Sequence, residues 1–343
     1  MPKPMPTSGP AARAPKKRGR AARVLTAALV LLGVAGYAAY HYGGIGGGPG
    51  HAECTVAVEG GTLRLEPQQA ANASTIAAVA SSRGLPERAV AIALATTMQE
   101  SALRNINHGD RDSMGLFQQR PSQGWGTAAQ IMDPVYASNE FFDGLVKIQG
   151  YSRLPLTVAA QRVQKSGYPQ AYAKHEGDAV LLAAALTGRH GGALTCTAAD
   201  GGRTVAGGDP ARVRTRLVRE FGPDVAPRTM AAADPGTEAG AKRDAKNGDT
   251  PERVKGGAQQ AAGRRTVAVP SAPADGGARG GGDARRGWEL AQWAVAHAHE
   301  LKVEKVAFAH REWSAAASGE GWTKSNGADS GAAAEDVRIT VAQ

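Results

Sequence analysis

The sequence predicts a mainly helical protein, with one N-terminal transmembrane helix and a small α/β C-terminal domain. Three observations predict this fold class: an uncharged stretch over Val24–Tyr42, alanine-rich helical windows in residues 51–198, and a return of Trp, Val and Leu in residues 285–343. Aromatic residues make up 5% of the chain, which also holds 45 Gly and 19 Pro. Such a composition is typical of compact segments separated by flexible connectors, so we do not expect one continuous core.

The N-terminal segment, residues 1–23, carries most of the positive charge. It contributes seven of the nine net positive charges and no acid, so the rest of the chain is close to neutral. The basic residues are Lys3, Arg13, Lys16, Lys17, Arg18, Arg20 and Arg23. A basic tail beside a membrane segment explains this charge better than a basic face for DNA, and no nucleic-acid partner is expected.

The stretch Val24–Tyr42 follows this tail and contains no Asp, Glu, Lys or Arg. At about 1.5 Å per residue it nearly spans a bilayer core of about 30 Å, which predicts a signal-anchor helix. The positive-inside rule then places the N-terminus in the cytoplasm and the later domains outside the cell, as in a single-pass protein of the cell membrane. A cleaved signal peptide, cut near Ala38 and Ala39, is the alternative.

The two cysteines, Cys54 and Cys196, both lie on the expected outer side and bracket residues 51–198. An even number of cysteines outside the cytoplasm suggests a disulfide. Neither a Cys-x-x-Cys pair nor a Cys/His cluster is present, so we predict no metal and no cofactor.

The regions after the membrane segment differ in composition. Residues 43–50 form a Gly-rich spacer, and residues 199–284 are interpreted as a disordered linker with one amphipathic helix over Pro210–Phe221. Residues 285–343 are expected to form a helix, a strand, a Trp-containing loop and a final strand. The ranges are Gly287–Leu301 for the helix and Lys305–His310 and Val337–Val341 for the strands.

Within residues 51–198 the clearest predicted helix begins at Pro86-Glu87 and runs to about Leu103. The residues next to Glu100 on this helix are small, which favours a concave surface there. Further helices are expected over Ala70–Arg83, Pro134–Gln149, Leu156–Ser166 and Ala179–Thr187.

Three short motifs carry chemical information. Glu100-Ser101 ends the helix, Gly115-Leu116-Phe117-Gln118 begins fifteen positions after Glu100, and Ala171-Tyr172 lies near the end of the domain. In this order the motifs resemble the lysozyme-like lytic transglycosylases and goose-type lysozymes, in a version typical of membrane-anchored actinobacterial proteins. The resemblance covers roughly residues 72–190 of a lysozyme-like domain at 54–198, and Ala173 stands where the family has Asn.

The resemblance implies roles for individual residues. Glu100 would be the general acid, because cleavage of a glycosidic bond needs a carboxyl group that is still protonated near neutral pH. Tyr172 would hydrogen-bond Glu100, and Ser101 and Gln118 would belong to the substrate site. Trp125 is a candidate face for a sugar ring or, equally, a core residue that holds its loop.

Two further carboxylates, Asp110 and Asp112, lie between the first two motifs. Either could activate water and give hydrolysis with inversion. Both also fit structural roles, since Asp110 follows Gly109 in a turn pair and Asp112 precedes Ser113 in a capping pattern. In the family that the motifs resemble, a hydroxyl of the muramic sugar can instead close an anhydro ring, and we favour that reaction slightly.

The C-terminal segment resembles a degenerate module of actinobacterial cell-wall hydrolases. Fuller versions carry His-Val-His in the last strand, whereas this chain has Asp336-Val337-Arg338. His297 and His299 point in different directions on a helix and could not share one metal ion. We interpret the module as a binding domain or an inactive remnant.

Taken together, these observations predict an enzyme that cleaves the glycan strands of peptidoglycan, as a muramidase or lytic transglycosylase. The alternative is a non-catalytic membrane protein that binds peptidoglycan or acts as a scaffold and retains the lysozyme-like fold.

Overall fold

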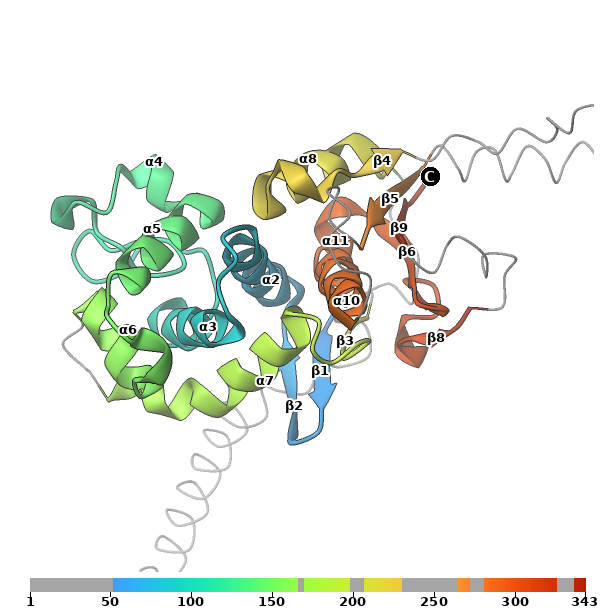
Figure 1. Cartoon of the computed structure of the whole chain (residues 1–343). Helices are drawn as coiled ribbons and strands as arrows, with labels where there is room; N and C mark the ends of the chain where they lie inside the picture. The colour runs from blue at the N-terminus through green and yellow to red at the C-terminus, as the bar shows by residue number, and fades with distance from the viewer. Residues whose placement is uncertain (1–51, 166–169, 198–206, 230–264, 272–280, 326–335) are drawn as a thin grey trace, which may run out of the picture. The chain divides into compact units, whose positions relative to one another are not determined.

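The computed structural model describes residues 52–165, 170–197, 207–229, 265–271, 281–325 and 336–343, which lie in one compact unit (Figure 1). The described elements include many helices together with one three-stranded and one six-stranded sheet. The fold is therefore mixed α/β, and the prediction of a mainly α protein is wrong. The strands are short, and several of them pair with strands that are distant in sequence. The sequence pattern of the helices is stronger than that of such strands, so the prediction favoured helices.

The helical part of the molecule surrounds one central helix, α3 (Glu87–Ser101). It packs against α2, α5, α6 and α7, as Figure 1 shows. The bounds are α2 (Pro67–Ser82), α5 (Pro134–Val146), α6 (Leu156–Gln164) and α7 (Glu176–Leu186), with shorter turns at α4 (Ala128–Ile131), η1 (Pro121–Gln123), η2 (Tyr151–Arg153) and η3 (Ala171–His175). The five predicted helices are confirmed, with ends that differ by a few residues.

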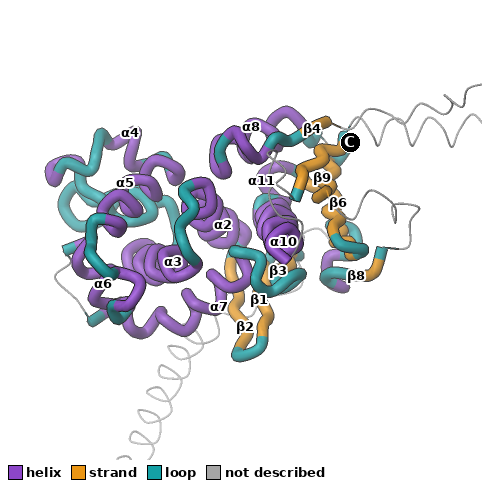
Figure 2. Tube along the Cα trace, in the orientation of Figure 1, coloured by secondary structure: helices purple, strands orange, loops and turns teal. Residues whose placement is uncertain are grey.

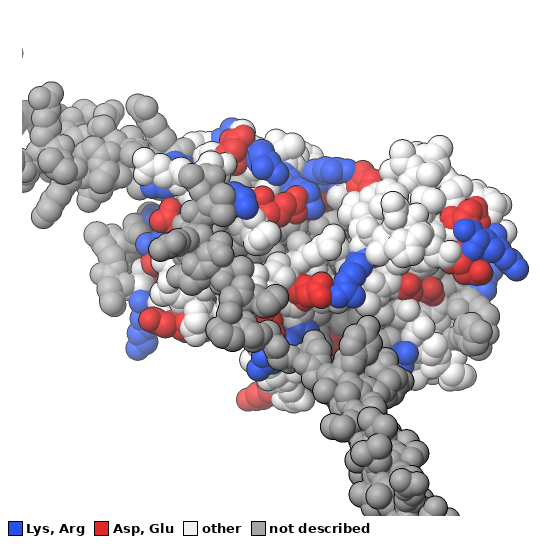
Figure 3. Space-filling view, turned by 180° about the vertical axis from the view of Figure 1, so that it is seen from behind, with Lys and Arg blue, Asp and Glu red and all other residues white. Residues whose placement is uncertain are grey.

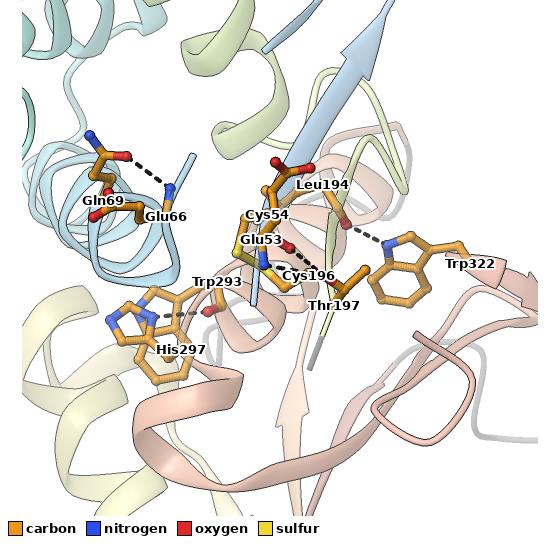
Figure 4. The surroundings of a disulfide bond; sticks show 10 residues. All are labelled: Glu53, Cys54, Glu66, Gln69, Leu194, Cys196, Thr197, Trp293, His297 and Trp322. Carbon is orange, nitrogen blue, oxygen red and sulfur yellow. Dashed lines mark hydrogen bonds between the residues drawn. A yellow bond between two sulfur atoms is a disulfide. The ribbon is translucent and has the colours of Figure 1, made fainter. Parts of the chain in front are cut away.

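A three-stranded sheet joins the start and the end of this helical part. Strands β1 (Cys54–Val58), β2 (Gly61–Leu65) and β3 (Leu194–Cys196) pair antiparallel in the order β2-β1-β3. Cys54 lies directly opposite Cys196 in the register of β1 and β3, and the two form the predicted disulfide (Figure 4). The disulfide bridges a sequence separation of 142 residues and so closes the predicted domain at its two ends.

The six-stranded antiparallel sheet has the order β4-β5-β9-β6-β7-β8. Its strands are β4 (Arg228–Thr229), β5 (Thr266–Pro270), β6 (Val303–Phe308), β7 (Arg311–Ser314), β8 (Thr323–Lys324) and β9 (Asp336–Val341). The two strands predicted here correspond to β6 and β9. Trp313, expected in a loop, lies in β7 and is buried. In β9 the side chains alternate between buried and half-buried, as in a strand with one face on the core.

Helix α10 (Gly281–Ala296) connects the sheet to the helical part (Figure 2). It packs against β6 and β9, and also against α2, α7 and β3. Gln292 extends this contact with two hydrogen bonds: its amide nitrogen donates to the carbonyl of Ala185 at 2.7 Å, and its oxygen accepts from the backbone of Leu194 at 2.9 Å.

Most of the described buried hydrophobic residues form one continuous cluster that runs from Cys54 to Val341. The expectation of separate cores is therefore wrong. The reason lies in α10 and the short α11 (Ala298–Leu301), where residues 290–298 are all buried because they are covered from both sides. The amino-acid composition of the whole chain cannot predict that one helix is buried between two parts of the molecule.

The region interpreted as a linker, residues 199–284, contains helix α8 (Pro210–Phe221), the short turn η4 (Pro223–Val225), strands β4 and β5, and the beginning of α10. Helix α8 has the predicted bounds and packs against α2 and β5. Strands β4 and β5 belong to the six-stranded sheet, so the C-terminal domain draws on chain that precedes residue 285. Most of the remaining linker lies outside the described residues.

The predicted transmembrane helix, residues 24–42, lies outside the described residues, as do the tail 1–23 and the spacer 43–50. In the part of the chain that the structure describes, no helix has the length and apolar character needed to cross a bilayer. The fold class is corrected accordingly: the described residues form a mixed α/β unit and include no membrane-spanning helix.

Candidate active site

Glu100 lies in the last turn of α3 and is half-buried. The helix ends immediately after Ser101, because Ala102 and Leu103 both adopt left-handed backbone conformations, with φ of 52° and 59°. The backbone N–H groups of these two residues bond back to the carbonyls of Met98 and Thr97. This double turn fixes the position of the helix end, and with it the direction in which Glu100 leaves the helix.

Tyr172, in η3, contacts Glu100 directly. Its side chain is fully buried, and its hydroxyl donates a hydrogen bond of 2.6 Å to Oε1 of Glu100. Two motifs that are 72 residues apart in sequence are thus joined, as the resemblance implied. A second contact lies beside this one: the side chains of Gln99 and His175 are 3.2 Å apart. The end of α3 thus contacts η3 through two consecutive residues, Gln99 and Glu100.

The environment of Glu100 raises the pKa of its carboxyl group. Burial is the main cause, while hydrogen bonds from Tyr172 and Gln164 act in the opposite direction by favouring the ionised form. The position in the last helical turn also disfavours a negative charge, because that end of the helix dipole is negative. Such a carboxyl group retains its proton to higher pH than an exposed one and can donate it to a leaving oxygen.

Ser101 connects α3 to the Gly-Leu-Phe-Gln motif. Its hydroxyl is buried and makes hydrogen bonds to the carbonyls of Leu116 at 2.7 Å and Thr97 at 3.2 Å. The described contacts of Ser101 are therefore with backbone, and they hold the motif loop against the helix that carries Glu100.

Gly115, the first residue of that motif, has a backbone that other residues adopt only with strain. Its φ is 76°, and a Cβ at this position would lie 2.6 Å from the carbonyl oxygen of Ile131. Its N–H also donates to the carbonyl of Ile106 at 2.7 Å. The glycine is therefore required by a close approach of backbone to backbone.

Gln118 folds back over its own loop. Its amide nitrogen donates to the carbonyls of His108 at 3.3 Å and Gly115 at 3.2 Å, and a Cβ on Gly109 would lie 1.8 Å from its oxygen. In the described part of the chain these bonds connect Gln118 to the loop and not to Glu100. Its expected place in the substrate site stays a prediction.

The aromatic residues near the motif contribute mainly to the core. Phe117 is fully buried and stacks on Phe141 with ring centroids 4.7 Å apart, so it packs inside the domain. Trp125 is half-buried and packs against the core. The neighbouring Gly126 has φ of 123°, and a Cβ there would lie 2.6 Å from the hydroxyl of Tyr136.

Asp112 is occupied by structural contacts. It pairs with Arg120 at 2.7 Å and accepts hydrogen bonds from the backbone N–H and the hydroxyl of Ser122, at 2.8 and 3.0 Å. The Arg120 guanidinium and the Ser122 donors hold the pKa of this carboxyl well below its usual range. Asp110 is exposed, and its backbone carbonyl accepts from Ser113 at 3.0 Å, as expected of a turn residue.

Sequence reasoning missed Gln164, the last residue of α6, whose side chain favours the ionised form of Glu100 and donates from Nε2 to the carbonyl of Phe117 at 2.7 Å. No sequence pattern singles out this residue, because Gln161 on the same helix looks equivalent. Proximity to Tyr172, eight residues later, was the only available signal.

Among the residues that the structure describes, no group of three or more His, Cys, Asp or Glu side chains could hold a metal ion. His297 is fully buried, and one ring nitrogen lies 3.0 Å from the carbonyl of Trp293. Asp336, at the place of the missing His, pairs with Arg228 at 3.0 Å.

Acidic and basic side chains lie next to one another on the face drawn in Figure 3. Elsewhere in the described chain, ion pairs also cross between elements, for example Arg189 and Arg285 with Glu87. This face shows mixed charge, in line with the small net charge of the chain beyond residue 23.

Comparison with known proteins locates one similarity. A family model described as VldE, C-terminal domain, matches residues 228–336, from the first residue of β4 to the first residue of β9. The match falls on the six-stranded sheet and its helices, and it begins well before the module expected at residues 285–343. No curated protein matches the chain. The matched region is under half of the chain and excludes Glu100 and Tyr172, so it describes what the C-terminal part is similar to.

Proposed function

We propose that this protein cleaves the glycan strands of peptidoglycan, with Glu100 as the general acid. The observation that carries the proposal is the half-buried Glu100 carboxyl, whose pKa is raised by burial and whose orientation is held by the buried Tyr172 hydroxyl. The order of the three sequence motifs, and their resemblance to lysozyme-like lytic transglycosylases, name the substrate class.

The proposed reaction begins with transfer of the Glu100 proton to the glycosidic oxygen as the bond between that oxygen and the anomeric carbon breaks. A hydroxyl of the same muramic sugar then forms the new bond to the anomeric carbon, and its proton returns to the Glu100 carboxylate. We favour this anhydro-forming route over hydrolysis because Arg120 and Ser122 occupy the oxygens of Asp112, which leaves that carboxylate a poor base for water.

The Cys54–Cys196 disulfide supports a site of action outside the cytoplasm, since disulfides persist in oxidising compartments and are rare in reducing ones. Peptidoglycan lies in such a compartment. The location and the substrate class are therefore consistent parts of one proposal.

A second candidate function, non-catalytic binding of peptidoglycan, is favoured by Gln118. Its amide is already bonded within its own loop, where a substrate-binding role would require it to face the sugar. Under this alternative Glu100 and Tyr172 would be retained features of an inactive lysozyme-like domain.

Mass analysis of peptidoglycan digested with the purified chain tests both candidates. We expect products with anhydro-muramic ends from the wild type and none from Glu100→Gln. Reducing muramic ends instead would indicate hydrolysis. Saturable binding without any released fragments, equal in the wild type and Glu100→Gln, would refute the enzyme proposal and support the binding protein.

A further inference from the structure

A cavity of about 420 Å³ lies where α10 packs against the helical part of the molecule. Its walls come from α2, the turn before α3, the first residues of α3, the residue after α7, and α10. Glu100 lies thirteen residues after Glu87 on α3, so at about 1.5 Å per residue this α10 cavity is about 20 Å from the candidate active site. A pocket of this volume has room for a small organic ligand.

Arg285 of α10 lines the cavity and is held in place by several bonds. It donates from Nε to the carbonyl of Thr187 at 2.8 Å, and from Nη2 to the hydroxyl of Thr187 at 3.1 Å and to Glu87 at 3.2 Å. Within the described part of the chain no bond uses Nη1, so this guanidinium retains a donor for a ligand.

Arg286, the next residue of α10, lines the same cavity and is also held in place. Its Nη1 donates to the hydroxyl of Ser81 at 2.6 Å and to Glu289 at 2.9 Å, and its guanidinium carbon lies 4.6 Å from the ring centroid of Phe221. The described bonds of Arg286 do not use Nε or Nη2. Both guanidinium groups are therefore positioned before a ligand binds, which reduces the entropy lost on binding.

The charges around the cavity favour an anion. Arg189 also pairs with Glu87, at 2.8 Å, so three guanidinium groups meet the two carboxyl groups of Glu87 and Glu289. Burial raises the pKa of Glu289, which weakens the negative contribution of that group. The beginning of α3, the positive end of its helix dipole, opens on the cavity as well.

The remaining wall is apolar and includes Ala77, Leu85 and Val90. We propose that the α10 cavity binds a small organic anion, whose carboxylate or phosphate group pairs with Arg285 and Arg286 and whose apolar part lies against this wall. Bidentate pairing with a guanidinium suits both kinds of anionic group. The inference concerns binding and does not rest on the proposed function of Glu100.

Calorimetric titration of the purified full-length chain at low ionic strength tests the proposal, since salt screens exposed charges. The probes are N-acetyl-alanyl-alanine, which ends in a carboxylate, phenyl phosphate, and the neutral carboxamide of the same dipeptide. Arg285→Gln removes one guanidinium from the cavity. Arg189→Gln is the matched control, because Arg189 pairs with the same Glu87 and is equally exposed, at 47% against 48%, but does not line the cavity.

We expect saturable binding of at least one of the two anions and no binding of the carboxamide. Preference for the dipeptide would indicate a peptide terminus as the source of the anion, and preference for phenyl phosphate a phosphate ester. Arg285→Gln should weaken binding by about tenfold or more, because charge-assisted hydrogen bonds are lost, whereas Arg189→Gln should change it by less than about threefold. In NMR spectra of the wild type, the backbone amides of Glu87 and Arg88 should shift during the titration.

Absence of saturable binding of both anions at millimolar concentrations would overturn the proposal, as would equal binding of the carboxamide. Equal losses in Arg285→Gln and Arg189→Gln would also overturn it, because surface charge alone would then explain the binding. If circular dichroism shows that Arg285→Gln does not fold, the wild-type NMR titration decides. Shifts centred on the cavity residues then support the site, and shifts centred elsewhere overturn it.

Discussion

Glu100 and Glu220 are both shielded from solvent, but their surroundings differ in kind. Glu220, in α8, is almost fully buried and forms an ion pair with Arg216. It also accepts hydrogen bonds from Trp293 at 2.7 Å and Thr75 at 3.1 Å. Glu100 accepts a hydrogen bond from the neutral hydroxyl of Tyr172, and burial raises its pKa.

The difference teaches how the same side chain can serve structure or chemistry. A buried carboxylate beside a guanidinium holds elements together through its hydrogen bonds, here α8, α2 and α10. A carboxyl group that is desolvated without a cation retains its proton to higher pH and can transfer it. The two sites differ mainly in the charge of the group that contacts each glutamate, Arg216 at Glu220 and Tyr172 at Glu100, and less in how deeply each glutamate is buried.

Replacing Glu100 by Gln should have the largest effect on activity and little effect on folding. We expect glycan cleavage to fall by about 10²- to 10⁴-fold, the usual contribution of a general acid. Stability above pH 7 should stay equal or rise, because a group whose folded pKa is raised destabilises the fold once pH exceeds its unfolded value of 4.5. Muropeptide release and urea unfolding at two pH values measure these effects, and a large loss of stability would contradict the comparison.

Replacing Glu220 by Gln should give the opposite result. The change leaves Arg216 without its buried counter-charge, and we expect a loss of about 3 kcal/mol in unfolding free energy. Below the unfolding transition the activity per folded molecule should be unchanged. Urea titration followed by tryptophan fluorescence measures the stability. A variant as stable as the wild type would show that the ion pair contributes little.

Tyr172→Phe should produce a smaller effect that is specific to the Glu100 site. Loss of the hydroxyl removes a bond that favours ionised Glu100, so the alkaline limit of activity should move to higher pH. We expect kcat on the acidic plateau to fall by about tenfold, as for loss of one charge-assisted hydrogen bond. A pH–rate profile tests this, and a shift to lower pH would exclude the assigned bond.

His297 should give the smallest effect, visible only as a pH dependence of stability. Burial lowers the pKa of this histidine from its ordinary 6.5, with nearby Glu220 opposing the change. Below pH 6.5 the unfolded chain therefore takes up a proton that the folded state does not, and stability should fall with a slope of at most about 1.4 kcal/mol per pH unit. His297→Gln should flatten this slope between pH 6.5 and 5 in urea unfolding curves. An unchanged slope would place the acid sensitivity elsewhere.

The candidate site was only partly accessible from sequence. The contact between Glu100 and Tyr172 followed from the order of motifs that resemble a known family. Gln164 could not be distinguished from Gln161, because both are polar residues on one amphipathic helix and only the position of the Phe117 carbonyl separates them. Asp112 is a similar case. The sequence presented it as a candidate base, and only the tertiary structure shows that it forms an ion pair with Arg120.

Local patterns in the sequence determined α3 and the four helices around it, the bounds of α8, and the existence of β6 and β9, because helical periodicity and strand alternation are short-range properties. They also predicted the Cys54–Cys196 pair. Tertiary structure alone decided that β1 pairs with β3, that β5 joins β9, and that α10 merges two expected domains into one core. These features depend on contacts between distant residues, which no local period records, and for that reason a fold that looked mainly helical contains two sheets.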